Sequence, residues 1–308
     1  MRRRLALVVA GILFAGLAGA VPAIADDHED DGGGTLMILG DSVAAGTQQP
    51  EPFTRGFQRK LFRELRDEYD FDSVVNLACP GDDTTEMVDG IGGASPFGSA
   101  CYGPFAQLRP GGSSQLDVAL AYLEENPGEV GLITITVGAN DILACDLEDP
   151  DVQACIGEQL GLISVNLPYI IARLMVAAPG VPIVGTNYYN PNLAFWLVDP
   201  AIAEASLALT PVFNGVLEAV YGAFGVPVAD LADAFKTFKT NGKPIPNNVK
   251  AICRLTLMCE KSGGDWILSD YDPNTPGPQT DIHPSNRGYR KIAATIFEVV
   301  EGEDLLDD

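Results

Sequence analysis

Ser42 and His283 are the residues of this chain whose types and positions best suit nucleophilic catalysis. Ser42 ends a Gly-Asp-Ser motif that directly follows the apolar run 35–39. A serine hydroxyl is a poor nucleophile unless a base removes its proton. The chain has two histidines, and one of them, His28, lies in an acidic stretch near the amino terminus. We therefore take His283, in the polar segment TDIHPSNRGY, as the candidate base.

Attack by a serine on a carbonyl also requires hydrogen-bond donors for the oxyanion that forms. Gly81 stands in the segment NLACPGDDT, and Asn140 stands in GAND after the apolar run 130–137. The backbone N–H groups of Ser42 and Gly81 and the side-chain amide of Asn140 are the donors we predict. Removing one such donor typically lowers the rate by about 10²- to 10³-fold. Taken singly, each motif is weak, because Gly, Asp and Ser are common turn residues and Asn is a common helix cap.

The elements that must position these residues alternate between strands and helices. The predicted strands lack apolar/polar alternation, as strands covered on both faces do. They span residues 35–39, 73–78, 130–137, 181–186 and 226–230. The helical patterns between and after them span residues 53–68, 114–125, 158–177 and 201–224, with a last helix beginning at Ser285. This alternation predicts βαβ units and a parallel sheet.

A flavodoxin-like strand order, 2-1-3-4-5, brings the candidate residues together. Ligands of open α/β sheets bind at the carboxyl ends of the strands. Ser42, Gly81 and Asn140 follow the first, second and third predicted strands, which this order makes neighbours. We therefore predict a three-layer α/β/α sandwich with a mostly parallel five-stranded sheet and a site at this edge.

The composition of successive segments indicates a leader, a tail and one domain. Residues 1–25 have the basic, apolar and small-residue regions of a signal peptide, and residues 26–34 form an acidic tail that we expect to be disordered. Residues 35–302 suffice for one domain, within which residues 236–282, rich in Pro, Gly and Asn, suggest an irregular lobe or lid. We expect secretion to the extracellular space and no stable membrane anchor once the signal is cleaved.

Net charge argues against anionic partners. The formal charge is −23 and becomes −26 when the three arginines of the leader are lost. Nucleic-acid binding needs clustered Lys and Arg, so we expect no nucleic-acid partner, and composition offers no basic patch for anionic lipid. We expect a soluble monomer.

Six cysteines in an exported chain predict three disulfides, for which fifteen pairings are possible. We favour Cys79–Cys101, Cys145–Cys155 and Cys253–Cys259, because each pair then lies within one connection between core elements. A zinc site is the rival, but there is no C-x-x-C spacing and histidine is nearly absent.

Together, the motifs GDS, CPG, GAND and DIHP resemble those of the SGNH (GDSL-type) hydrolases, in particular secreted bacterial lipases and esterases. The resemblance implies the flavodoxin-like fold, no metal and no cofactor, Ser42 as nucleophile, His283 as base, and Gly81 and Asn140 as oxyanion donors. Sequential disulfides also resemble the pattern in secreted bacterial members. One departure concerns the acid: the family has Asp-x-x-His, whereas here Thr280 holds that position and Asp281 lies two residues before His283. Asp281 is the candidate orienting acid, and a backbone carbonyl is the alternative.

The resemblance implies hydrolysis of carboxylic esters, with a small-molecule or lipid ester as substrate. The aromatic and apolar segment 187–198 favours lipid or other hydrophobic acyl esters, although Phe195 and Trp196 are equally well explained as core. Tyr188 and Tyr189 are candidate substrate-binding residues that could stack on sugar rings. The alternatives are a carbohydrate acetylesterase and a non-catalytic exported binding protein. An α/β-hydrolase is disfavoured because no G-x-S-x-G motif surrounds Ser42.

Overall fold

Five parallel strands form the central sheet of the computed structural model. They are β1 (Thr35–Gly40), β2 (Ser73–Asn76), β3 (Val130–Thr136), β4 (Ile183–Thr186) and β5 (Val228–Ala229), in the order β2-β1-β3-β4-β5. This is the predicted flavodoxin-like order. The structure describes residues 34–47, 56–90, 113–145, 149–242, 244–270 and 280–307. The predicted signal peptide 1–25 and nearly all of the tail 26–34 lie outside these ranges, so both stay predictions.

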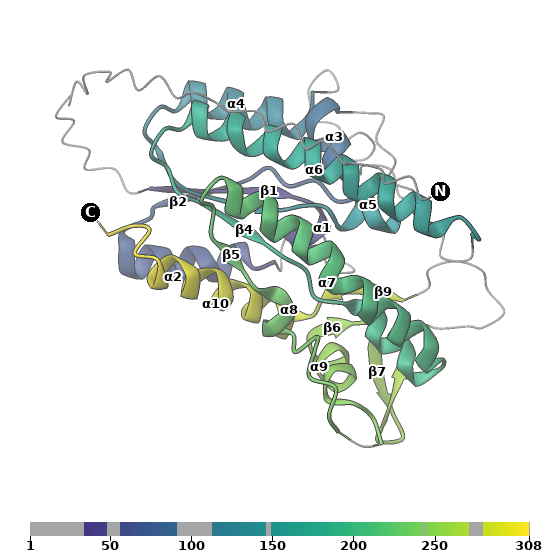
Figure 1. Cartoon of the computed structure of the whole chain (residues 1–308). Helices are drawn as coiled ribbons and strands as arrows, with labels where there is room; N and C mark the ends of the chain where they lie inside the picture. Colours follow the sequence, from purple (N-terminus) through teal and green to yellow (C-terminus); the bar gives the residue numbers. More distant parts are fainter. Residues whose placement is uncertain are drawn as a thin grey trace, which may run out of the picture. The chain divides into compact units, whose positions relative to one another are not determined.

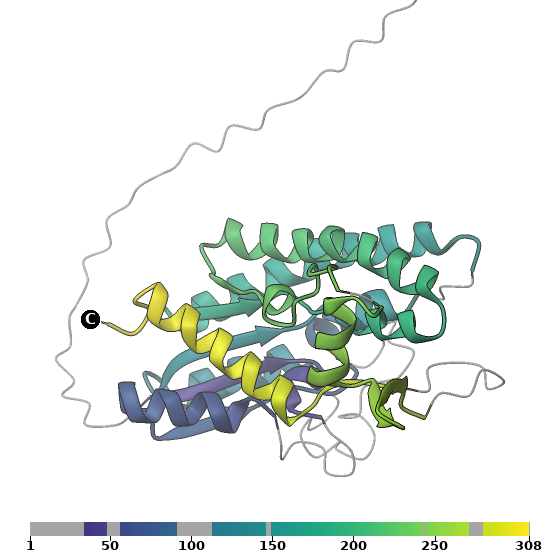
Figure 2. The ribbon, with the colours of Figure 1, turned by 90° about the horizontal axis from the view of Figure 1, so that it is seen from below.

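Helices cover both faces of the sheet (Figure 1). One face carries α2 (Gln58–Tyr69) and α10 (Asn286–Gly302), which pack against each other. The other carries α4 (Gln115–Glu125), α6 (Val152–Ala177) and α7 (Pro200–Ala223). Figure 2 views the same body from the side of α2 and α10. Right-handed crossovers place α2 on one face and α4, α6 and α7 on the other, because the chain moves one way from β1 to β2 and the other way afterwards.

The core forms where the helices press their apolar sides onto the sheet. Leu61 and Leu65 of α2 and Ile292 and Ile296 of α10 are fully buried, as are Leu36 to Leu39 of β1. The four-residue spacing within each helix pair is that of one helix face, which is why the sequence pattern identified both helices. Burial of β1 on both sides explains its continuous apolar run.

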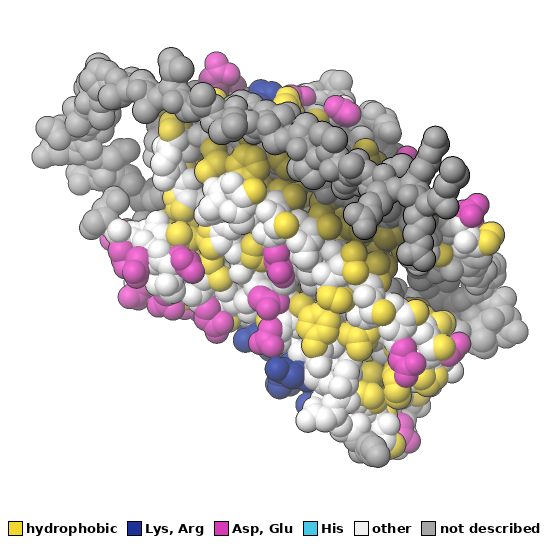
Figure 3. Space-filling model, in the orientation of Figure 1, with side chains coloured by type: hydrophobic (Ala, Val, Ile, Leu, Met, Phe, Trp, Pro, Cys, Tyr) yellow, Lys and Arg dark blue, Asp and Glu magenta, His cyan; other side chains and the backbone are white. Residues whose placement is uncertain are grey.

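Two helices are apolar beyond their core-facing sides. By length and composition, α6 and α7 could each cross a membrane, which the sequence analysis did not foresee. Long helices of soluble proteins meet the same criterion, and here buried residues such as Ile163, Leu167 and Ile170 of α6 pack in the core. Val165, Val176 and Val212 stay exposed, and hydrophobic atoms are visible over this part of the surface (Figure 3).

Short elements sit between the long ones, and several of them border the carboxyl edge of the sheet. They are α1 (Ser42–Ala45), α3 (Thr84–Asp89), α5 (Ala139–Leu143), the 3₁₀ helix η4 (Pro191–Leu197) and α8 (Leu231–Ala234). Segment 236–282 is more regular than expected: its described part holds α9 (Asn247–Leu255), β6 (Thr256–Leu257), and the hairpin of β7 (Cys259–Ser262) and β8 (Asp265–Leu268). β6 pairs with β9 (Asp281–Pro284), the strand that carries His283. A lid role for this segment stays a prediction.

Candidate active site

Ser42 lies at the start of α1, where the chain turns sharply out of β1. Gly40 makes this turn with φ of 132°, and a Cβ there would stand 1.9 Å from the carbonyl oxygen of Thr136. Only glycine fits such a position. Asp41 then caps α1 by accepting a 2.8 Å hydrogen bond from the Val43 backbone N–H. The Gly-Asp-Ser motif therefore presents a half-buried serine at the carboxyl edge of the sheet.

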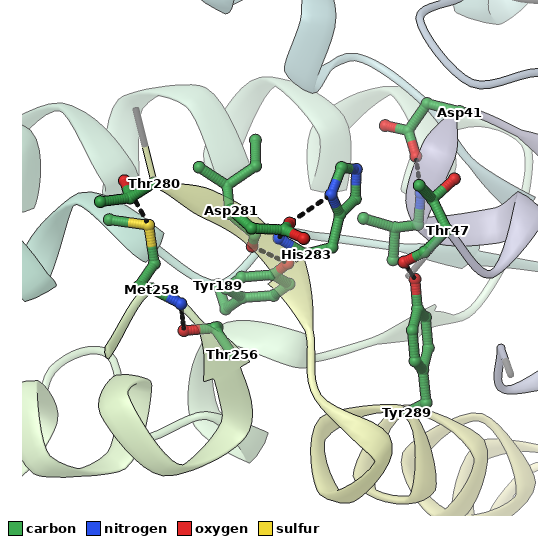
Figure 4. Close-up of polar contacts among 11 residues, drawn as sticks. Asp41, Thr47, Tyr189, Thr256, Met258, Thr280, Asp281, His283 and Tyr289 are labelled. Carbon is green, nitrogen blue, oxygen red and sulfur yellow. Dashed lines mark hydrogen bonds and ion pairs between the residues drawn. The ribbon is translucent and has the colours of Figure 1, made fainter. Parts of the chain in front are cut away.

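Asp281 reaches the candidate base despite its unusual spacing. Its Oδ1 lies 2.6 Å from Nδ1 of His283 and also accepts the His283 backbone N–H at 2.9 Å (Figure 4). Burial raises the pKa of Asp281, but the hydrogen bonds and charge of His283 outweigh burial and leave that pKa below its usual value. A carboxylate on Nδ1 leaves Nε2 as the nitrogen able to take a proton from a hydroxyl.

The strand carrying His283 packs against the helix carrying Ser42, since β9 and α1 are in contact. Figure 4 shows the imidazole between Asp281 on one side and Asp41 on the other. The charge of His283 also acts on Asp41, whose pKa it lowers. Two ends of the chain, some 240 residues apart in sequence, thus meet at one edge.

Asn140 is anchored on the neighbouring strand tip. It is the second residue of α5, which follows β3, and its side chain is 6% exposed. Its Nδ2 donates a 2.8 Å hydrogen bond to the backbone carbonyl of Asp82, the residue after Gly81. Because an amide nitrogen carries two hydrogens, one remains for another acceptor. The bond ties the two predicted oxyanion donors, Gly81 and Asn140, to one another.

Gln115 joins these parts and was missed by the sequence analysis. It is fully buried at the start of α4, accepts the Gly40 N–H at 2.6 Å and donates to the Gly40 carbonyl at 3.0 Å. Its amide also donates to Asp82 Oδ2 at 2.8 Å. It thereby links the turn before Ser42 to the loop of Gly81. The only signal nearby in the sequence is the capping residue Ser114, which says nothing about this role.

Buried acids surround the site. Burial raises the pKa of Asp41 to about 6 against the lowering effect of its hydrogen bond from Tyr188, and raises that of Asp141 to about 7 although Thr84 donates two hydrogen bonds to it. Burial and the charges of Asp83 and Asp82 raise the pKa of Glu86 to about 7. In the part of the chain that the structure describes, no three His, Cys, Asp or Glu side chains are placed to hold a metal.

Tyr188 and Tyr189 both point their hydroxyls into the protein. Each is 5% exposed. Tyr188 donates to Asp41 Oδ2 at 2.5 Å, and Tyr189 donates to the backbone carbonyl of Ile282 at 2.9 Å while its ring stacks on Phe235. These contacts indicate that the two tyrosines brace α1 and β9. Their predicted role in binding substrate stays a prediction.

Two of the predicted disulfides are present. Cys145 is bonded to Cys155, and Cys253 to Cys259. The first joins the end of α5, which carries Asn140, to α6. The predicted partner of Cys79, Cys101, lies outside the described residues, so that pairing stays a prediction. Disulfides of this kind fit an extracellular protein.

Comparison with known proteins supplies the family. Among solved structures, a lipase from a goat rumen metagenome aligns with a TM-score of 0.49 and 17% identity over 86% of this chain and 97% of its own. A catalytic mutant of an acetylxylan esterase from Geobacillus stearothermophilus aligns with a TM-score of 0.50 and 13% identity over 87% of this chain and 94% of its own. Phospholipase A1 from Streptomyces albidoflavus NA297 aligns with a TM-score of 0.48 and 14% identity over 87% of this chain and 99% of its own.

At these identities the likeness concerns the fold alone. A search of curated proteins found no match. The family model is decisive, because it spans the end of β1, the Gly-Asp-Ser turn, both candidate oxyanion residues and His283 in one match over residues 38–291. The chain therefore belongs to the GDSL-like lipase/acylhydrolase family and is an ester hydrolase.

Proposed function

We propose that this protein is an exported serine esterase or lipase that cleaves carboxylic esters, preferably with hydrophobic acyl groups. The observation that carries the proposal is the 2.6 Å contact between Asp281 and Nδ1 of His283 on a strand packed against the helix that begins with Ser42. Ser42, His283 and Asp281 would then serve as nucleophile, base and orienting acid. Export is supported by the two disulfides and by the leader-like residues 1–25.

The reaction proceeds in two steps. The Ser42 oxygen attacks the ester carbonyl while Nε2 of His283 accepts the hydroxyl proton, and Asp281 stabilises the imidazolium that results. The oxyanion accepts hydrogen bonds from the backbone N–H groups of Ser42 and Gly81 and from the Asn140 amide. The tetrahedral intermediate then expels the alcohol, which takes the proton from His283. In the second step His283 deprotonates a water molecule, which attacks the acyl-serine. The intermediate then releases the carboxylic acid, and the Ser42 oxygen takes the proton back from His283.

A hydrophobic acyl group is supported by the surroundings of β9. The 3₁₀ helix η4 contacts both β9 and β8, and it contains Phe195 and Trp196, which are partly buried. The exposed Ile267 lies on β8. Apolar side chains therefore border the strand of His283. The carbohydrate acetylesterase reading draws less support, because the tyrosines expected to stack on sugars have buried hydroxyls bonded to the protein.

A fluorophosphonate probe tests the chemistry. We expect stoichiometric labelling of Ser42 in the wild type and none in Ser42→Ala. The matched control is Ser164→Ala, an exposed serine on α6 whose hydroxyl bonds the Leu160 carbonyl. Absence of labelling in folded wild-type protein would favour a non-catalytic binding protein. A series of p-nitrophenyl esters from acetate to palmitate then tests the substrate: a steep preference for acetate would favour the acetylesterase.

A further inference from the structure

Positive charge is concentrated on one side of this acidic protein. Except for Arg173 on α6, every Lys and Arg that the structure describes lies on α2, at the start of α10 or in segment 236–261. They are Arg59, Lys60, Arg63, Arg66, Lys236, Lys239, Lys250, Arg254, Lys261, Arg287, Arg290 and Lys291. In Figure 3, most of the visible Lys and Arg atoms gather beside α8 and α9. The net charge, which sums over the whole chain, does not show this uneven distribution.

Part of this side is a cationic cluster, which we define as Arg59, Lys60 and Arg63 of α2 with Arg287 and Arg290 of α10. The two helices pack side by side (Figure 2). The pKa of Lys60 is lowered, first by burial and then by the charges of Arg290, Arg63 and Arg59. Cations from two separate helices therefore lie close enough to act on one another.

The cationic cluster is electrostatically costly. Arg59 and Arg63 are four residues apart and Arg287 and Arg290 are three apart, so each pair shares a helix face, where like charges destabilise a helix. Neither helix has an acidic residue in its first turn to offset the positive end of its dipole. Among the described residues, no carboxylate lies within ion-pair distance of these four arginines, whereas Arg66 on the same helix pairs with Asp67 at 2.6 Å.

The cluster borders the catalytic edge. α10 begins three residues after His283, and Tyr289 in its first turn donates a 2.9 Å hydrogen bond to the carbonyl of Thr47, just beyond α1. On α2, the preceding Gly56 lies so close to Gly46 that a Cβ on Gly46 would stand 2.5 Å from its Cα. The first turns of both helices therefore flank the segment that closes the helix of Ser42.

We propose that the cationic cluster binds an anionic group, a phosphate or a carboxylate, carried by the ester substrate. This inference rests on the proposed function and adds the charge of the substrate to it. Guanidinium groups present forked donors that match both kinds of oxyanion. A bound anion offsets the repulsion within the cluster, and the local field attracts such a substrate even though the protein is acidic overall.

Two p-nitrophenyl esters of equal acyl length test the proposal. Mono-p-nitrophenyl adipate carries a terminal carboxylate, and p-nitrophenyl hexanoate is neutral. For the wild type we expect kcat/KM at low salt to be roughly fivefold higher for the adipate than for the hexanoate. This is the effect expected of two partly exposed ionic contacts between the carboxylate and the arginines of the cluster. The ratio should approach 1 at about 1 M NaCl, where the Debye length falls to about 3 Å. Arg59→Gln/Arg290→Gln should lose the preference, whereas the matched control Arg66→Gln should keep it.

A second arm identifies the source of the anion. Sedimentation of the Ser42→Ala protein with phosphatidylglycerol or phosphatidylcholine vesicles compares binding to a phosphate headgroup with net negative charge and to a zwitterionic one. A preference for the anionic member in either arm, lost in the double variant, supports the proposal, and the arm in which it occurs names the source. No preference in either arm, or a preference that survives the double substitution, overturns it. Hydrolysis of the neutral hexanoate reports separately on ester hydrolysis, and circular dichroism on folding.

Discussion

The hydroxyl of Tyr188 donates a 2.5 Å hydrogen bond to Oδ2 of Asp41, the residue immediately before Ser42. The other carboxylate oxygen of Asp41 accepts a hydrogen bond from the Val43 N–H and so caps α1. Asp41 is almost completely buried, and its pKa is raised to about 6 from an ordinary 3.8 by burial, with Tyr188, Val43 and His283 acting in the opposite direction. A tyrosine after β4 thus keeps the helix cap beside the nucleophile ionised.

Replacing Tyr188 with Phe should produce a deficit in rate that depends on pH. Without its hydroxyl, the pKa of Asp41 rises further, so more of the carboxyl is protonated at pH 7 and holds the Val43 N–H less firmly. We expect kcat/KM to fall about 10-fold at pH 6 and to recover towards the wild-type value by pH 8.5, where Asp41 is ionised in both proteins. The measurement is the pH profile of ester hydrolysis.

Tyr221→Phe is the matched control for this change. Tyr221 is also fully buried, and its hydroxyl bonds the Ile135 carbonyl at 3.3 Å. We expect its pH profile to follow the wild type. A deficit in Tyr188→Phe that is the same at every pH would mean that the tyrosine only fills space.

Asp281→Asn tests the orienting acid. The amide cannot stabilise the imidazolium and favours the wrong tautomer, so we expect kcat to fall by about 10²- to 10⁴-fold with little change in KM. Stopped assays with purified protein and circular dichroism check this. Turnover close to wild type would show that a backbone carbonyl can orient His283 and that the mechanism needs only Ser42 and His283.

Asn140→Ala removes one predicted oxyanion donor, and kcat should drop by about 10²- to 10³-fold. Asn166→Ala is the control, because its amide nitrogen bonds Thr84 and Thr85 on α3 and supplies no predicted oxyanion donor. Steady-state kinetics on one short-chain ester compare the two variants. If Asn140→Ala raised KM and left kcat unchanged, Asn140 would be a substrate-binding residue and not an oxyanion donor.

Gln115→Leu should weaken both the fold and the site. The change leaves the Gly40 N–H without its acceptor, and a buried polar group left unpaired costs about 1–3 kcal/mol. It also removes one hydrogen bond from Asp82 and one of the two that the Gly40 carbonyl accepts, the other coming from the Cys79 N–H at 2.8 Å. We expect a loss of roughly 2–4 kcal/mol in the free energy of unfolding, measured in urea, together with a lower kcat. Gln153→Leu, an exposed substitution on α6, should change neither. An unchanged urea midpoint for Gln115→Leu would contradict this account.

Glu86 makes stability depend on pH in the direction opposite to ordinary acid unfolding. Its folded pKa, about 7, exceeds the usual 4.5, so between these values the folded protein binds more protons than the unfolded chain. The contribution of Glu86 to stability is therefore complete below about pH 4.5 and is lost as the pH rises through 7.

Between pH 5 and 8, Glu86 should lower the free energy of unfolding of the wild type by about 1–2 kcal/mol, and Glu86→Gln should remove this loss. Urea unfolding at the two pH values measures it, with Glu64→Gln on the exposed side of α2 as control. An equal pH slope in Glu86→Gln and the wild type would assign the effect to other groups.

Much of this molecule follows from local patterns in the sequence. The continuous apolar runs and the four-residue spacing of Leu61 and Leu65 identify strands and helices, because burial on one or both faces leaves its pattern in the sequence. The strand order then places Ser42, Gly81 and Asn140 at one edge, since carboxyl ends of neighbouring parallel strands coincide. The scarcity of histidine makes His283 the candidate base.

Only the tertiary structure decided the contacts between distant or unusually spaced groups. Asp281 reaches Nδ1 of His283 through the local geometry of β9, which residue spacing does not reveal. Tyr188 meets Asp41 across 147 positions and Gln115 meets Gly40 across 75, and no periodicity records such pairs. The cationic cluster is likewise invisible to net charge, because charge sums over the chain whereas a field depends on which side chains the packing of α2 against α10 brings together.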